Sequence, residues 1–317
     1  MMPLLHGAGT STGTVQDSHP VHKFVLNARA AYLRDHCPGG LPLFGTVMGI
    51  EAMAAAFAMV QPWRGQTRRV ASDIRIDAPL ILTDDHAHAE IEVRSKRLVL
   101  DGTEAVACVL GSRGADKAWQ QHFAASFRWE SGAADVPLWA EVHSARSAQS
   151  AASVPVSAAS IYGLFFHGPA FRVINSAVLV DGMMCSEYQT ALPGLFDGQN
   201  PETKWQPNNG PSCAGPQQLE LCLQTAGLLD IATTARMMIP HHIDRIDWHV
   251  GERGHHIDTL RAVARRCPPK LANSFDMVLG HPREPTWALV HGYACTPLPF
   301  ASDGAAIEHL RQCFHRQ

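Results

Sequence analysis

The residues Thr46–Val60, TVMGIEAMAAAFAMV, constrain the fold of this chain more than any other stretch. They are rich in Ala and Met, which favour a helix, and they are apolar almost all the way round it. A helix of about four turns without a polar face must be enclosed by the rest of the protein. We expect Thr46 to be its N-cap, and Pro62 stops the pattern.

Runs with strand character follow this helix. Residues 87–93 alternate polar and apolar side chains, as a half-buried strand does. The other candidate strands are 69–76, 78–82, 104–111 and 122–129. One long buried helix followed by consecutive strands predicts an α+β unit in which antiparallel strands wrap round a central helix.

The same plan occurs a second time. A second mostly apolar helix is predicted at 216–235, with strand candidates at 171–179, 186–191, 242–250, 260–265, 274–279 and 287–293. The Ala/Ser-rich residues 143–160 have little periodicity and are typical of a linker. A structural duplication is therefore expected, with a flexible N-terminus at 1–20, one unit at 21–142 and another at 161–317.

Composition limits the classes of partner. The net charge of −3 over 317 residues gives no reason to expect nucleic acid or an anionic membrane as a partner. No apolar run approaches the roughly 18 residues of a transmembrane helix. Eight scattered cysteines without CxxC spacing indicate reduced thiols in a cytoplasmic protein. The 18 histidines include no HExxH and no convincing Cys/His ligand set, so we expect no metal site.

A first candidate site precedes the apolar helix. His36 stands before a turn containing Gly40 and Gly45, and Thr46 begins the helical pattern. An imidazole is a base near neutral pH, and free N–H groups at a helix start can hold an oxyanion. This arrangement suits proton abstraction next to a thioester carbonyl. The alternative is a loop histidine that caps a strand, with glycines that serve only the turn.

A second candidate lies on the second helix. Glu220 and Gln224 are four residues apart and share one helix face, in otherwise apolar surroundings. Because an ionised carboxylate is costly to bury, we expect the pKa of Glu220 to rise and the group to act as a general acid. The alternative is that Glu220 points to solvent. A third segment, His167 to Phe171 (HGPAF), predicts a turn.

Together these segments resemble the dehydratase domains of modular polyketide synthases, over residues 21 to about 298. The HxxxGxxxxP motif of that family matches His36 and Gly40, with Gly45 at the place of the proline. The family's DxxxQ or DxxxH motif matches Glu220 and Gln224, with Glu at the place of Asp.

The family's YGPxF turn matches the HGPAF segment, in which His167 takes the place of tyrosine. The resemblance implies a double hotdog fold, in which two antiparallel sheets each wrap round a central helix. It also implies an acyl carrier protein as the substrate carrier, whose phosphopantetheine holds the acyl chain as a thioester. The other implied partners are further polyketide synthase domains and a second copy of the chain, with no metal or bound cofactor.

The activity implied is elimination of water from a 3-hydroxyacyl thioester to give the 2-enoyl thioester. His36 would remove the C2 proton, and N–H groups from Gly40 to Thr46 would stabilise the developing oxyanion. Glu220 would protonate the leaving hydroxyl, and Gln224 would orient Glu220 or the leaving water.

Four alternatives stay open from the sequence. The same His/carboxylate pair suits a double-bond isomerase or an enzyme that closes an oxygen ring. With three motif positions altered, the chain also suits a non-catalytic dehydratase-like scaffold. A hotdog thioesterase would need a carboxylate that activates water at the carbonyl. Glu51 on the first helix is a second candidate acid, because single-hotdog dehydratases place a Glu there, whereas double-hotdog relatives favour Glu220.

Overall fold

The computed structural model describes most of the chain between residues 20 and 315. The described residues are 20–27, 31–82, 88–114, 118–132, 134–137, 140, 155–189, 215–250, 260–267, 273–281, 286–297 and 304–315. The predicted flexible N-terminus lies outside them except for Pro20, as do residues 143–154 of the predicted linker. The remainder of that linker contains regular structure, β6 (Val156–Ser157) and α4 (Ala158–Tyr162).

The first half of the chain contains the predicted central helix and five strands. The helix, α2, spans Thr46–Val60 as expected. The strands are β1 (Val21–Asn27), β2 (Arg68–Ile76), β3 (His88–Leu100), β4 (Thr103–Arg113) and β5 (Trp119–Glu130). Two short helices, α1 (Ala31–Arg34) and the 3₁₀ helix η1 (Pro38–Gly40), precede α2. The strand β1 was not predicted, because its apolar and polar residues lack a clean alternation.

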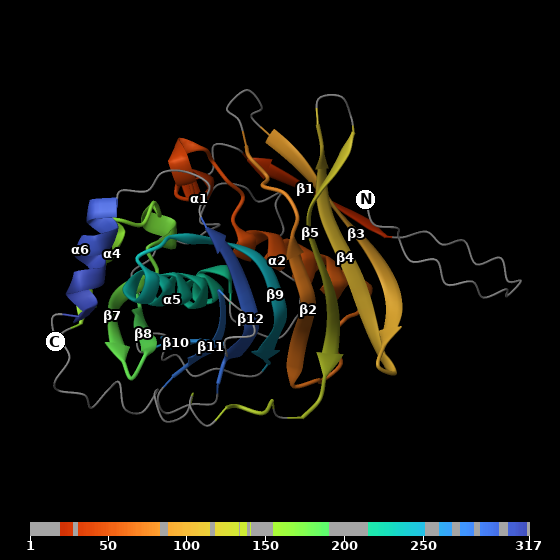
Figure 1. Cartoon of the computed structure of the whole chain (residues 1–317). Coiled ribbons are helices and arrows are strands. Elements are labelled where there is room, and N and C mark those ends of the chain that lie inside the picture. The colour runs from red at the N-terminus through yellow and green to blue at the C-terminus, as the bar shows by residue number, and fades with distance from the viewer. Residues whose placement is uncertain are drawn as a thin grey trace, which may run out of the picture.

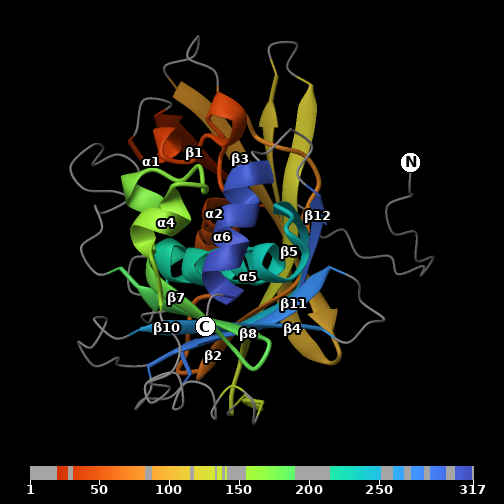
Figure 2. The same cartoon turned by 60° about the vertical axis from the view of Figure 1, so that its left-hand side comes forward.

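The second half repeats this plan around α5 (Pro216–Thr234), which lies where the second helix was predicted. Its strands are β7 (Ile174–Val180), β8 (Met183–Tyr188), β9 (Met238–His249), β10 (Arg261–Arg266), β11 (Ser274–Gly280) and β12 (Ala288–Pro297). A 3₁₀ turn, η2 (Pro169–Phe171), precedes β7, and a terminal helix, α6 (Gly304–His315), packs on α5. Figure 2 places α6 across α5.

The strands form one continuous antiparallel sheet rather than two separate ones. Within the described residues the order is β1-β3-β4-β5-β2-β9-β12-β11-β10-β8-β7-β6. The first five strands curve round α2 and the remainder curve round α5 (Figure 1). Each half is thus an antiparallel sheet wrapped round a helix, which is the α+β hotdog plan. The expectation of two sheets is corrected in one respect, since β2 and β9 pair and join them edge to edge.

Ion pairs reinforce this seam between the halves. The guanidinium of Arg68 on β2 lies 2.8 Å from Glu130 on β5 and 2.7 Å from Asp247 on β9. Arg245 on β9 reaches the same two carboxylates, at 3.1 and 2.6 Å. These groups are largely shielded from solvent. Removing one partner of such a buried ion-pair network lowers the stability of the fold, because a charge is left buried and unpaired. The network therefore fixes the two halves in one register.

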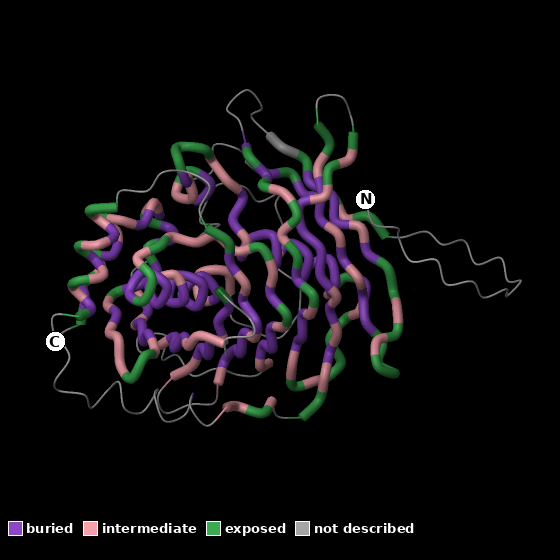
Figure 3. Tube along the Cα trace, viewed as in Figure 1, coloured by how far each residue is buried: buried purple, intermediate pink, exposed green. Residues whose placement is uncertain are grey.

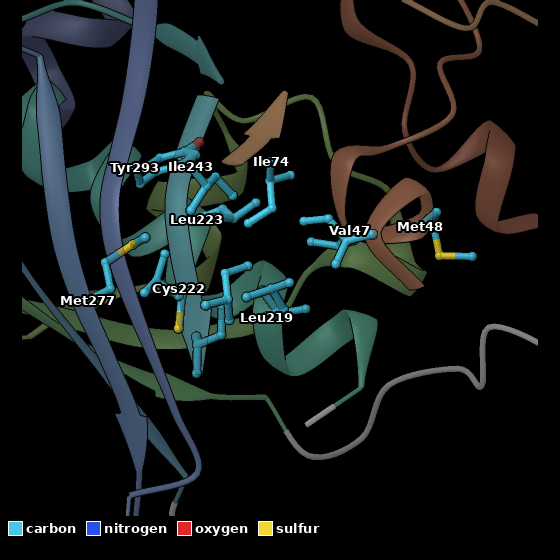
Figure 4. Packing of buried hydrophobic residues seen from close by; sticks show 14 of the residues in the cluster. Val47, Met48, Ile74, Leu219, Cys222, Leu223, Ile243, Met277 and Tyr293 are labelled. Carbon is cyan, nitrogen blue, oxygen red and sulfur yellow. The ribbon is translucent and has the colours of Figure 1, made fainter. Parts of the chain in front are cut away.

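Both central helices are enclosed, as the apolar sequence of α2 requires (Figure 3). In Figure 4, Val47 of α2 points toward Leu219 of α5, whereas Met48 points to the opposite side. Ile74 of β2 and Ile243 of β9 are also buried, and their side chains belong to the layer between the helices and the paired strands β2 and β9. No helix in the described part of the chain is long and apolar enough to cross a membrane.

The start of α2 differs from the prediction in one detail. Thr46 is the first helical residue, and the N-cap is Gly45, whose extended backbone makes no side-chain cap. The Thr46 side chain lines a cavity instead. The first N–H groups of α2 therefore have no capping side chain, and helix geometry leaves them without an intrahelical acceptor.

Candidate active site

His36 is held by the turn that leads into α2. Its Nδ1 lies 3.0 Å from the carbonyl oxygen of Leu43, and its own carbonyl accepts a 2.9 Å hydrogen bond from the Leu43 N–H. Because a carbonyl only accepts, Nδ1 must carry the proton. Nε2 is then an unprotonated base, and His36 lines the cavity.

The surroundings of the His36 ring are aromatic and close-packed. The ring centroid lies 5.2 Å from that of Phe166 and 5.7 Å from that of Phe171, both in edge-on geometry. A Cβ added to Gly45 would stand 3.6 Å from the imidazole, so the bare backbone of Gly45 packs beside it. Gly40, in contrast, is exposed in a left-handed turn (φ +80°) and does not line the cavity. Its role is that of a turn residue.

The His36 turn meets the HGPAF turn of the other half. His36 and His167 form an antiparallel bridge, with ring centroids 5.5 Å apart. The Asp35 carbonyl accepts a 2.8 Å bond from the Gly168 N–H, and its carboxylate accepts one of 2.7 Å from the Ala170 N–H. A Cβ at Gly168 would overlap the Asp35 carboxylate, so glycine is required there. The predicted turn thus delivers His167 to His36.

The predicted carboxylate completes the cluster. Glu220 and Gln224 both face the cavity from α5 and are buried, so the solvent-exposed alternative for Glu220 is wrong. His167 Nε2 lies 3.3 Å from Glu220 Oε1, and Gln224 Nε2 donates to the same oxygen at 3.0 Å. Among the described residues no hydrogen bond reaches Glu220 Oε2. That oxygen is therefore the one available to a ligand.

Gln224 is itself fixed by groups that the sequence did not single out. Its amide also donates to the Phe171 carbonyl at 2.9 Å, and its Oε1 accepts from the Tyr162 hydroxyl at 2.9 Å. The Tyr162 oxygen in turn accepts the Ile174 N–H at 2.7 Å. Tyr162 lies at the end of α4, just after the predicted linker 143–160, where no sequence signal linked it to the site.

The electrostatics of His36 follow from its enclosure. Burial and, next, the charge of the neighbouring His167 lower the pKa of His36 to about 4, against the opposing charge of Glu220. At neutral pH the imidazole is therefore uncharged and able to accept a proton.

Glu220 corrects a sequence-based expectation. Burial alone raises its pKa, as predicted, but the hydrogen bond and charge of His167, the charge of His36 and the hydrogen bond from Gln224 outweigh burial. The pKa of Glu220 is therefore held below its ordinary value. The expectation failed because it counted the apolar neighbours on α5 and not the donors that other segments bring to the carboxylate.

A cavity of about 440 Å³ opens beside these groups, a size typical of small-molecule sites. His36, His167, Glu220 and Gln224 all line it, together with Thr46. Most of the rest of its wall is apolar. Leu41 and Ile81, which are 51% and 41% exposed, mark where the lining reaches the surface.

Glu51, the second candidate acid, does not line this cavity. Its carboxylate lies 4.0 Å from the guanidinium of Arg69 on β2. Burial raises the pKa of Glu51, and Arg69 opposes the rise. The side chain thus serves a pairing within the first half. Among the described residues, no three His, Cys, Asp or Glu side chains gather closely enough to hold a metal ion.

Comparisons with known proteins give the fold a context. No family model matches the sequence, and no curated protein matches it. Among solved structures, the dehydratase domain from the CurF module of curacin polyketide synthase matches with a TM-score of 0.69. Its identity is 15%, over 91% of this chain and 97% of that one. A trans-AT polyketide synthase dehydratase domain from Brevibacillus brevis matches with a TM-score of 0.66 and 15% identity, over 90% and 96%.

Two variants of the CurK dehydratase also match, each with a TM-score of 0.65 and 16% identity. They cover 91% and 92% of this chain, and 96% and 97% of their own. Both are described as inactive, one with a histidine changed to phenylalanine and the other with an aspartate changed to asparagine. The resemblance to polyketide synthase dehydratase domains therefore holds at the level of the fold across nearly the whole chain.

Proposed function

We propose that the protein is a dehydratase that removes water from a 3-hydroxyacyl thioester and forms the 2-enoyl thioester. The observation that carries this proposal is the meeting of a neutral imidazole and a fixed carboxyl group in one largely apolar cavity. Elimination needs a base and an acid that act together on neighbouring carbons. The fold is that of proteins named as dehydratase domains, including two inactive CurK variants changed at a histidine and at an aspartate.

In the proposed reaction, Nε2 of His36 removes the proton from C2 of the substrate. The electron pair of the broken C2–H bond forms the C2–C3 double bond as the C3–oxygen bond breaks. The N–H groups at the start of α2, near Gly45 and Thr46, stabilise the negative charge that develops on the thioester oxygen. The Nδ1–Leu43 hydrogen bond keeps the ring in the tautomer that this step needs.

The departing hydroxyl takes its proton from Glu220, through Oε2, and leaves as water. His167 and Gln224 occupy Oε1, so that the proton resides on the oxygen that faces the substrate. Burial opposes the hydrogen bonds in setting the pKa of Glu220. An acyl chain that displaces water from the cavity strengthens the effect of burial and favours the protonated carboxyl.

The substrate is proposed to arrive on the phosphopantetheine of an acyl carrier protein, within or beside a polyketide synthase, with a second copy of the chain as partner. Support comes from the enclosed reacting groups and from the apolar Leu41 and Ile81 where the cavity lining reaches the surface. A flexible arm is the kind of carrier that reaches such groups. No metal or bound cofactor enters this scheme.

Product analysis separates dehydration from the alternatives. We would incubate the protein with a 3-hydroxyacyl carrier protein and, separately, with the 2-enoyl form, and follow the acyl chain by mass spectrometry and NMR. Dehydration predicts loss of one water from the first substrate and partial addition of water to the second. Migration of the double bond without any loss of water would identify an isomerase. Ring closure at constant mass would identify a cyclase, and no reaction would favour a scaffold.

A further inference from the structure

One face of α5 continues the cavity beyond the reacting groups. Glu220, Leu223, Gln224, Gly227 and Ile231 all line it, and their spacing of three and four residues places them on one side of the helix. Gly227 follows Glu220 by seven residues, which is about 10 Å along the helix axis. The wall therefore extends well past the carboxyl group that serves C3 in the proposed reaction.

The glycine at position 227 is not demanded by the fold. It lies in the interior of α5, where glycine is less favourable than alanine. A Cβ added there would meet Phe165 at 3.6 Å, an ordinary contact. Gly49 on α2 behaves differently, because a Cβ there would stand 2.9 Å from Phe123. Packing thus explains Gly49, whereas at position 227 it leaves space that opens into the cavity.

The wall around this space is apolar. Phe165, Ile231, Met237, Phe275 and Cys295 line the cavity on the side of Gly227. The carboxylate of Asp230, which also lines the cavity, has a side chain only 2% exposed and is paired with Arg266 through Oδ1. A largely apolar surface of this kind suits an alkyl chain.

We propose that the acyl substrate is long and apolar, that its chain lies along α5, and that Gly227 leaves the room it needs. The inference rests on the proposed function for the position of C3 at Glu220. An extended chain advances about 1.2 Å per bond, so about eight bonds reach from Glu220 to Gly227. Acyl chains of about twelve carbons would pass Gly227, whereas chains of about four carbons would end before it.

The test compares the wild type, Gly227→Leu and a control variant, Thr234→Leu. Thr234 lies on the same helix but is exposed and outside the cavity lining. Turnover is measured with 3-hydroxyacyl carrier proteins of about four and about twelve carbons, lengths chosen from the chain geometry above. Binding of saturated acyl-pantetheine thioesters of the same two lengths is measured by calorimetry, which requires no chemistry.

We expect the wild type to favour the longer chain in both assays. Gly227→Leu should lower the ratio of kcat/KM for the longer chain over the shorter by at least tenfold, with a similar loss in the binding ratio. Thr234→Leu should keep both ratios. Equal losses for the two lengths, or unchanged ratios, in Gly227→Leu would overturn the inference.

The two proposals fail in different ways. If no variant turns over either substrate but Gly227→Leu loses the preference in binding, the proposed function is wrong and the acyl pocket stands. If the wild type dehydrates both substrates and Gly227→Leu keeps the wild-type ratio, only the pocket assignment is wrong. The variant Gly227→Ala adds a readout independent of both. It should melt at a higher temperature than the wild type, and a lower melting temperature would show that the fold itself needs glycine.

Discussion

Replacing His167 by phenylalanine should change the pH at which His36 loses its activity as a base. The two ring centroids are 5.5 Å apart, and His167 lowers the pKa of His36. A unit charge at that distance, at an effective dielectric constant of about 20, contributes about 3 kcal/mol, or about two pKa units. Removing it should raise the pKa of His36 above about 4, by up to about two units.

The direction of the pH dependence follows from the role of His36 as the base. His36 acts when neutral, so the acid limb of kcat/KM reports His36 and activity is lost as the pH falls through its pKa, whereas a fall as the pH rises reports Glu220, which acts when protonated. In the wild type this acid limb should lie near pH 4, and in His167→Phe it should lie at a higher pH, by up to about two units. The assay is kcat/KM from about pH 3.5 to pH 8, within the range in which each variant stays folded by circular dichroism.

A matched control removes a partly buried carboxylate outside the cavity. Glu51→Gln should leave the acid limb where it is in the wild type, because Glu51 pairs with Arg69 and does not line the cavity. An acid limb that stays near pH 4 in His167→Phe would mean that His167 carries no charge beside His36. The electrostatic account of the site would then be refuted.

Three further substitutions test the supports of the site. Gln224→Leu breaks the hydrogen bonds that fix the carboxyl group, and kcat should fall about tenfold or more with a smaller change in KM, measured by steady-state kinetics. Gly168→Ala forces a methyl group onto the Asp35 carboxylate and should destabilise the protein by about 1–3 kcal/mol in urea unfolding; wild-type stability would contradict this packing. Asp230→Ala leaves the guanidinium of Arg266 without its buried partner, and a loss of about 3–5 kcal/mol is expected in the same assay.

The local pattern of apolar and polar residues was enough to predict much of the fold. The apolar run at α2 and the predicted helix at α5 are helices with the expected bounds to within one residue. Most of the predicted strands are also present, because their apolar residues face one of these helices and must be spaced accordingly. The edge strand β1 and the terminal helix α6 were not predicted. Neither encloses a core alone, and their patterns are correspondingly weak.

The candidate site could be predicted in composition but not in its electrostatics. The motif spacing identified His36, Glu220 and Gln224 as candidate site residues. In the structure all three line one cavity. The direction of the pKa shift of Glu220 could not be read from α5, because His167 comes from another segment. Tyr162 was missed for the same reason, since its contact with Gln224 exists only after α4 packs beside α5 within the second half.

The joining of the two halves was also beyond sequence reasoning. A duplicated plan predicts two sheets, but which edges meet depends on pairs such as Ala71 with Ile246, which lie far apart in the chain. The ion pairs of Arg68 with Glu130 and Asp247 add a non-local reason for that choice. An alternation of period two determines which side chains of a strand face the core, but it does not determine which other strand pairs with it.

The most direct test of the account is the mass of an acyl chain on its carrier protein after incubation with the wild type and with His36→Ala. The account predicts that the wild type removes one water from a 3-hydroxyacyl chain of about twelve carbons, a length taken from the extent of the cavity along α5. His36→Ala, folded by circular dichroism, should be slower by roughly 10²–10⁴. Water loss at the wild-type rate in His36→Ala would contradict the assignment of His36 as the base.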